Sequence, residues 1–169
     1  IRSIPKPVIC GVNGVAAGAG VNIALNCDIV FAARSAKFIQ AFSKIGLLPD
    51  SGGTWHLPRL VGEARAKALI MTAEPLMAQE AQDIGMIYKC VDDSELRDEA
   101  LAMASKLAKG ATFGLGLAKH AIHSASSNTL DEQLDLERDL QLQAGRSPDY
   151  AEGVTAFMEK RTPKFTGKK

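Results

Sequence analysis

Two segments of the sequence carry residues whose types and spacing could do chemistry. The first is Gly18-Ala19-Gly20. Small residues at the start of a helix let a ligand approach backbone N–H groups, which carry the positive end of the helix dipole. Such a place suits an anionic oxygen that forms during a reaction. The same residues also fit tight packing of a helix on a strand, and this alternative stays open here.

The second segment places one acid, Asp50, among apolar and small side chains. With Leu47, Leu48 and Trp55 nearby, we expect a carboxylate beside an apolar pocket, where it could act as a base toward an acidic C–H bond. The alternative is structural. In that interpretation Pro49 and Asp50 form a turn, and the Asp50 side chain caps the next helix.

Other catalytic and ligand-binding patterns are weak. The glycines imitate a dinucleotide-binding fingerprint, but the acidic residue Asp28 follows them too early in the chain. His120 and His123 stand three residues apart on a predicted helix, without a third metal ligand at a usable spacing. His56 is interpreted as either a supporting residue of the second segment or a surface residue. We therefore expect neither a metal nor a cofactor.

Composition excludes several classes of protein. The 169 residues are 46% hydrophobic and 23% charged, which is typical of a globular chain, and a net charge of +1 argues against a nucleic-acid partner. Residues 8–27 carry no charge, but glycines and asparagines interrupt them, so no membrane span is expected. Three cysteines without metal-binding spacing indicate reduced, buried thiols in a cytoplasmic protein.

The elements that must position these residues change character near residue 92. Before that point, short apolar runs bounded by glycine and proline predict strands, and the stretches between them predict short helices. The predicted strands are residues 7–12, 28–32, 37–40 and 86–91, and the predicted helices are residues 19–26, 63–72 and 78–84.

After residue 92 the pattern is helical, with helices expected at 93–109 and 130–144 and a last one from Pro148. Thr129 and Glu132 form a capping box, and Ser147 caps the last helix. The apolar residues of 130–144 spread around more than half of the helix, so we expect it to be buried on two sides. The apolar face of the last helix holds Tyr150, Val154, Phe157 and Met158. The tail, residues 162–169, is expected to be extended.

In this order and spacing, the two segments resemble the enoyl-CoA hydratase/isomerase (crotonase) family. The matching blocks are residues 7–14, 17–20, 27–32, 46–54, 85–87 and 152–161. The resemblance implies an α/β fold with two parts. Residues 1–92 would form the C-terminal part of a ββα spiral, with half of the oxyanion hole and the catalytic loop, and residues 93–169 a helical oligomerisation region that builds trimers or hexamers. Family members are longer at the N-terminus, so the chain is expected to be truncated.

The resemblance also implies an acyl-CoA substrate, of which coenzyme A is a part rather than a separate cofactor. The thioester oxygen would sit between two backbone N–H donors. One is the amide of Ala19, and the other precedes residue 1. Lys160 matches a lysine that reaches the CoA phosphate of a neighbouring subunit, while the position of an aromatic residue that contacts adenine in some members is Gln141. The other expected substrate-binding residues are Gly18, Gly20, Leu48 and Trp55.

Residue identity separates the reactions within the family. Hydratases use two glutamates, and the matching positions here are Asn22 and Phe42, neither of which is an acid or base. Several isomerases place an aspartate at the position of Asp50. The resemblance, greatest to members that isomerise ring epoxides, therefore implies an acyl-CoA isomerase acting through a thioester enolate, in aromatic (phenylacetate) or fatty acid catabolism. The alternatives are an enoyl-CoA hydratase and a non-catalytic assembly or binding subunit that forms one half of a multienzyme complex. A hydratase is also an expected partner of the chain.

Overall fold

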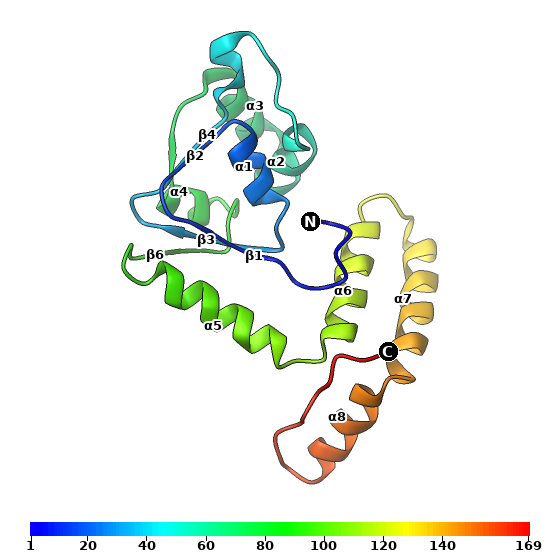
Figure 1. The fold of residues 1–169 in the computed structure, drawn as a ribbon. Helices are drawn as coiled ribbons and strands as arrows, with labels where there is room; N and C mark the ends of the chain where they lie inside the picture. The colour runs from blue at the N-terminus through cyan, green and yellow to red at the C-terminus, as the bar shows by residue number, and fades with distance from the viewer. The chain divides into compact units, whose positions relative to one another are not determined.

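The chain divides into two compact units, seen in a computed structural model that describes residues 1–169 (Figure 1). The first unit comprises residues 8–102 together with 1–2, and the second comprises residues 103–169 together with 3–7. The change of character expected near residue 92 falls just before α5 (Leu96–Ala108), whereas the two units divide within that helix.

The first unit is built on two three-stranded sheets. One has the order β1-β3-β6 and is parallel throughout; the other has the order β2-β4-β5, with β4 and β5 antiparallel. The strands are β1 (Ile9–Val12), β2 (Val15–Ala17), β3 (Ile29–Ala33), β4 (Lys37–Ile39), β5 (Leu76–Met77) and β6 (Lys89–Val91). Two strands followed by a helix recur in chain order (Figure 1). In successive repeats β3 pairs in parallel with β1, and β4 pairs in parallel with β2. This confirms the expected ββα spiral.

Helices α1 and α4 contact the strands, α2 packs on α1, and α3 packs on α2 and on the 3-10 turn that precedes α2. They are α1 (Ala19–Leu25), α2 (Gly53–Val61), α3 (Glu63–Thr72) and α4 (Ala78–Asp83), with a 3-10 turn, η1 (Ala41–Ile45), between β4 and α2. The largest fully buried side chains of the chain all belong to this unit: Phe31 of β3, Leu57 of α2, and Val21 and Asn22 of α1. A polar amide therefore lies among the most deeply buried groups of the core.

Short strands and the thiols account for most of the differences from expectation in this unit. Strands β2 and β5 have only three and two residues, too few to show an alternating pattern. Cys90 is buried as expected, but Cys10 on β1 and Cys27 after α1 are only half-buried. Burial, together with the neighbouring Cys27, raises the pKa of the Cys10 thiol to about 11.

The second unit contains three complete helices, and the starts of the last two were predicted from capping residues. They are α6 (Thr112–Ser124), α7 (Leu130–Gly145) and α8 (Pro148–Met158). At α7 the Thr129 hydroxyl accepts the Glu132 N–H at 3.3 Å, and the Glu132 carboxylate accepts the Thr129 N–H at 2.7 Å. At α8 the Ser147 hydroxyl accepts the Tyr150 N–H at 3.2 Å. None of the helices combines the length and apolar character needed to cross a membrane.

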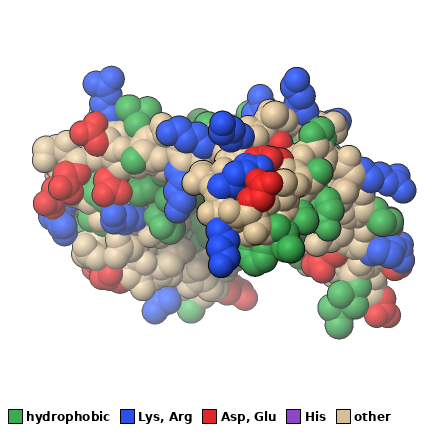
Figure 2. Space-filling model, turned by 90° about the horizontal axis from the view of Figure 1, so that it is seen from below, with side chains coloured by type: hydrophobic (Ala, Val, Ile, Leu, Met, Phe, Trp, Pro, Cys, Tyr) green, Lys and Arg blue, Asp and Glu red, His purple; other side chains and the backbone are tan.

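Much of the apolar surface of these helices faces solvent. The expectation that α7 is buried on two sides is wrong for the single chain, in which only Leu140 of that helix is buried and Leu130 is 73% exposed. On α8, Phe157 is 83% exposed. Figure 2 shows such hydrophobic side chains at the surface among interspersed charges of both signs. The physical reason is that α7 and α8 have too few neighbours within one chain to cover two faces.

The C-terminal tail, residues 162–169, has no helix, in agreement with the prediction. Two carboxylates of α8 bind its backbone and side chains. Buried Asp149 accepts the N–H groups of Thr166 and Gly167 at 2.7 and 2.8 Å. Burial works to raise the pKa of Asp149, but these hydrogen bonds hold it below its ordinary value. Glu152 forms a bidentate pair with Arg161, whose hydrogen bonds lower the pKa of that carboxyl from 4.5 to about 2.

We predict that the tail loosens in acid because of Glu152. Its pKa is lower in the folded chain, so its contribution to stability is complete above about pH 4.5 and is lost as the pH falls toward about 2. Hydrogen exchange of residues 161–167, measured from neutral to acidic pH, should show opening over that window. Glu152→Gln should speed exchange of the tail at neutral pH and remove the dependence of tail opening on pH. The exposed control Glu74→Gln should keep the pH dependence of the unmodified protein. Superimposable profiles for all three proteins would contradict the prediction.

Candidate active site

The glycine-rich segment forms the entry to helix α1. Gly18 is the residue before the helix and has φ 53°, a left-handed value that favours glycine, and its N–H donates to the Ile39 carbonyl at 2.9 Å. Ala19 is the first residue of α1, where a backbone N–H has no acceptor within the helix. A side chain at exposed Gly20 would meet nothing within 4 Å. The segment thus presents a backbone donor on an open surface.

The loop that carries Asp50 differs from expectation in two ways. Asp50 is exposed rather than beside a closed apolar pocket, because Leu47 and Leu48 on its N-terminal side also project into solvent. Its side chain does not cap α2 either: the residue before that helix is Gly52, and no side chain caps it. The turn itself is confirmed, since the Gly53 N–H donates to the Asp50 carbonyl at 2.9 Å.

Leu48 and Trp55 flank this loop with apolar surface. Leu48 is 75% exposed, and Trp55, on the first turns of α2, is 37% exposed. The guanidinium groups of Arg2 and Arg59 lie 4.5 and 4.0 Å from the centre of the Trp55 ring. Stacking of this kind restrains the indole, because cations are attracted to the ring face.

A hydrogen-bonded network joins α1 to the Asp50 loop. Of its side chains, those of Gln40 and Asn26 were not singled out from the sequence, and Asn22 was named only as the position of a hydratase glutamate. The Asn22 side chain donates to the Asp50 carbonyl at 2.9 Å and accepts from the Gln40 side chain at 2.8 Å. One helical turn later, the Asn26 side chain donates to the Ser51 carbonyl at 2.9 Å and pairs with His56 Nε2 at 3.0 Å. Two asparagines four residues apart in a short apolar helix are the sequence signal that could have revealed it.

This network decides between the two interpretations of His56. The side chain is only 7% exposed and its Nε2 pairs with Asn26, so it supports the loop and is not a surface residue. Asn22 is fully buried and Phe42 is nearly so. The Phe42 ring lies 3.6 Å from where a side chain on Gly18 would begin. Neither position therefore offers a group that could activate water.

Lys160 belongs to the second unit and follows the end of α8. It is exposed and has φ 53°, an unusual left-handed value for a lysine. The backbone around it is held by the Arg161 N–H, which donates to the Ala156 carbonyl at 3.0 Å, and by the pairing of Arg161 with Glu152. Its predicted role toward a CoA phosphate thus involves a part of the chain separate from the Asp50 loop.

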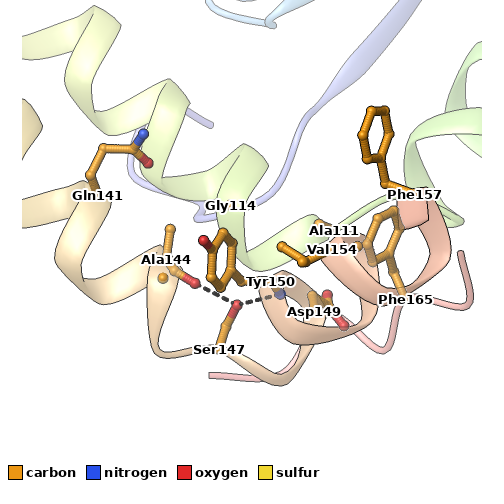
Figure 3. A pocket seen from close by; sticks show the side chains of 12 residues that line it. Ala111, Gly114, Gln141, Ala144, Ser147, Asp149, Tyr150, Val154, Phe157 and Phe165 are labelled. Atoms are coloured by element: carbon orange, nitrogen blue, oxygen red, sulfur yellow. Dashed lines mark hydrogen bonds between the residues drawn. The ribbon is translucent and has the colours of Figure 1, made fainter.

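The second unit also contains a pocket of about 620 Å³ (Figure 3). It is lined by residues of α6, α7, α8 and the tail, among them Gln141, Tyr150, Val154, Phe157 and Phe165. Figure 3 shows the Ser147 hydroxyl between the Ala144 carbonyl and the Tyr150 N–H, which fixes the start of α8 at its edge. The lining is largely apolar and aromatic.

Comparison with known proteins identifies the class to which this fold and site belong. The sequence model of the family described as "Enoyl-CoA hydratase/isomerase" matches residues 1–168, and the chain belongs to that family. It is 61% identical over 168 residues to the 1,2-epoxyphenylacetyl-CoA isomerase of Escherichia coli (strain K12), covering 99% of this chain and 64% of that protein. It is 50% identical to a probable enoyl-CoA hydratase of Rhodobacter capsulatus, covering 99% and 65%.

Solved structures agree with this assignment. An enoyl-CoA hydratase from Polaromonas sp. JS666 superposes with a TM-score of 0.94 at 43% identity, over 98% of this chain and 65% of that one. A putative enoyl-CoA hydratase/isomerase from Mycobacterium abscessus gives 0.96 at 35% identity, over 99% and 64%. The chain therefore has the crotonase fold and spans about 64–65% of the length of the relatives it matches.

We predict that Gly53→Ala damages the loop. The added Cβ would lie 2.6 Å from Cγ of buried Asn22, so the amide must move and its bond to the Asp50 carbonyl breaks. Overpacking of this kind costs about 1–3 kcal/mol, which a denaturant titration can measure. Gly14→Ala is the matched control, because its Cβ would meet nothing within 4 Å and its φ is not left-handed. Equal stability of the two variants would contradict the prediction.

Proposed function

We propose that this chain carries an acyl-CoA isomerase activity that proceeds through a thioester enolate. The observation that carries the proposal is the state of the two positions at which the resemblance places the glutamates of hydratases. Asn22 is buried with its amide engaged at both ends, and Phe42 is an apolar ring. With no group there to activate water, Asp50 is the carboxylate of this region that is free to act on a substrate.

The proposed mechanism moves a proton without a cofactor. The Ala19 N–H, with a second donor, polarises the thioester carbonyl and stabilises the negative oxygen of the enolate. The Asp50 carboxylate accepts the proton that leaves one substrate carbon and returns it to another, so no atom is gained or lost. Only backbone groups of Asp50 form hydrogen bonds in the chain, which leaves its carboxylate available.

The substrate proposal follows from the relatives and from the apolar surface beside Asp50. The name of the E. coli relative, 61% identical, supports a ring-epoxide aromatic acyl-CoA. Leu48 and Trp55 are exposed near Asp50, where an acyl group would cover them and exclude water from the carboxylate. Lys160 is proposed to pair with a CoA phosphate. Coenzyme A would thus enter as part of the substrate.

The hydratase alternative is favoured by the name of the R. capsulatus relative. A spectroscopic assay with crotonyl-CoA distinguishes the two reactions, because hydration removes the conjugated double bond. We expect little or no water addition to crotonyl-CoA and measurable isomerisation of an epoxide or enoyl substrate. Rapid hydration of crotonyl-CoA would favour the hydratase over the proposed isomerase.

We predict that Asp50→Asn lowers turnover by ~10² or more while acyl-CoA binding stays nearly unchanged. The amide has nearly the same shape but cannot accept a proton at neutral pH. Because the Asp50 side chain makes no hydrogen bond within the chain, the melting temperature should also stay the same. Steady-state kinetics and thermal unfolding are measured on the protein at its native length, with exposed Asp131→Asn as the control. A variant with full turnover would refute the catalytic role.

We also propose that the chain assembles into a homo-oligomer, a trimer or hexamer, through α6 to α8. Ile122, Leu130 and Phe157 are 72%, 73% and 83% exposed, and the largely apolar pocket lies between the same helices. A stable protein seldom leaves so much large apolar surface to water, and a second copy would cover it.

We predict from this surface a solution mass that is a multiple of 18.0 kDa in light scattering at micromolar concentration. Phe157→Asp should shift the mass toward the monomer, because burying a carboxylate in an apolar interface is costly. Met71→Asp is the matched control, since Met71 is also exposed, at 69%, but lies on α3. A parent protein of 18.0 kDa, or equal dissociation by both variants, would count against this assembly.

A further inference from the structure

We propose that Asn22 and Asn26 are positioning residues that hold the backbone of Asp50 and Ser51 against helix α1. The inference rests on the proposed function, in which the Asp50 carboxylate acts on the substrate. Both asparagines act through that loop: their amides bind its carbonyl groups, and neither needs to touch a reacting atom.

Asn22 is held so firmly that its amide has one usable orientation. The side chain is 0% exposed, and its oxygen accepts the Gln40 side-chain N–H at 2.8 Å. The opposite end of the amide must then point its N–H at the Asp50 carbonyl, 2.9 Å away. Gly53 leaves just enough room for this amide, because a Cβ there would overlap it. The carbonyl of the proposed base is thus fixed by a group that solvent cannot reach.

Asn26 connects three parts of the chain at once. Its side-chain N–H groups donate to the Asn22 carbonyl of α1 at 2.8 Å and to the Ser51 carbonyl of the loop at 2.9 Å. Its oxygen pairs with His56 Nε2 of α2 at 3.0 Å. Because an amide oxygen can only accept, His56 is the donor and carries its proton on Nε2. A single side chain therefore joins the helix of the Ala19 donor to the Asp50 loop and to α2.

The loop needs such support because its backbone is strained. Ser51 has φ 48° and Gly52 has φ 81°, so two successive residues adopt the left-handed conformation. Glycine tolerates it, but a serine prefers ordinary backbone angles and stays there only where its surroundings hold it. The Asn26 bond to the Ser51 carbonyl is that restraint. Without it, Ser51 can relax, and the direction in which Asp50 projects changes.

Geometry of this kind affects rate more than binding. A base must lie within hydrogen-bond reach of the proton it accepts, and small displacements cost large factors in turnover. In the proposed function, substrate binding also uses Leu48, Lys160 and residues 18–20, to which the two asparagine side chains make no hydrogen bond. We therefore expect loss of the Asn26 amide to lower kcat while leaving KM nearly unchanged.

The test compares Asn26→Ala with Gln82→Ala in the protein at its native length. Gln82 also binds a backbone group through its side chain, accepting the Cys90 N–H at 2.7 Å in the same unit, but far from the loop in sequence. Two quantities are measured: hydrogen exchange of residues 50–56 under native conditions, and kcat with KM. Asn26→Ala should accelerate exchange by ~10-fold or more and lower kcat by ~10–10². Gln82→Ala should change neither.

The outcomes separate this inference from the proposed function. Faster exchange with unchanged kcat, in a protein that Asp50→Asn inactivates, would overturn the positioning role. If Asp50→Asn keeps full turnover, the proposed function fails, and the exchange data alone decide whether the asparagines hold the loop. Unchanged exchange in Asn26→Ala overturns the inference in either case. Should Asn26→Ala not fold, Asn26→Ser, which keeps a shorter donor, should give intermediate exchange and kcat.

Discussion

The buried amide of Asn22 is the group on which the geometry of the candidate site depends. It is sealed from water between the Gln40 side chain and the Asp50 carbonyl, and a buried amide that lost either partner would be costly. The end of β4, helix α1 and the loop before α2 must therefore be correctly placed together. The side-chain oxygen of Gln40, Oε1, is buried and has no hydrogen-bond partner in the chain, so the network ends at Gln40.

Elements with local signals could be predicted from the sequence. Helix α3 has the predicted bounds, and α7 and α8 start at their predicted caps, because a capping hydroxyl and its partner lie within three residues. Strand β5, with two residues, owes its existence to pairing with Lys37 and Phe38 of β4. That pairing forms only in the folded chain, so the two residues of β5 carry no sequence pattern from which the strand could be predicted.

The site could be predicted only in part. Residue types and resemblance indicate Asp50 and the Ala19 amide as candidates, but the position of the Asp50 side chain depends on backbone angles at Ser51 and Gly52 that serine does not signal. The two asparagines were missed as supports because polarity in a sequence does not reveal burial. The exposed faces of α7 and α8 show the same limit, since an apolar pattern in the sequence does not reveal whether the single chain covers it.

Trp55 makes the candidate site accessible to fluorescence measurements. It is the sole tryptophan of the chain, it stands two residues beyond Gly53, and its ring is 4.8 Å from that of His56, which holds Asn26. The indole also lies against two guanidinium groups, so its excited state senses nearby charge as well as water. Tryptophan fluorescence of this chain, excited at wavelengths that its two tyrosines hardly absorb, therefore originates beside the candidate site, and changes in its wavelength or intensity report on that neighbourhood.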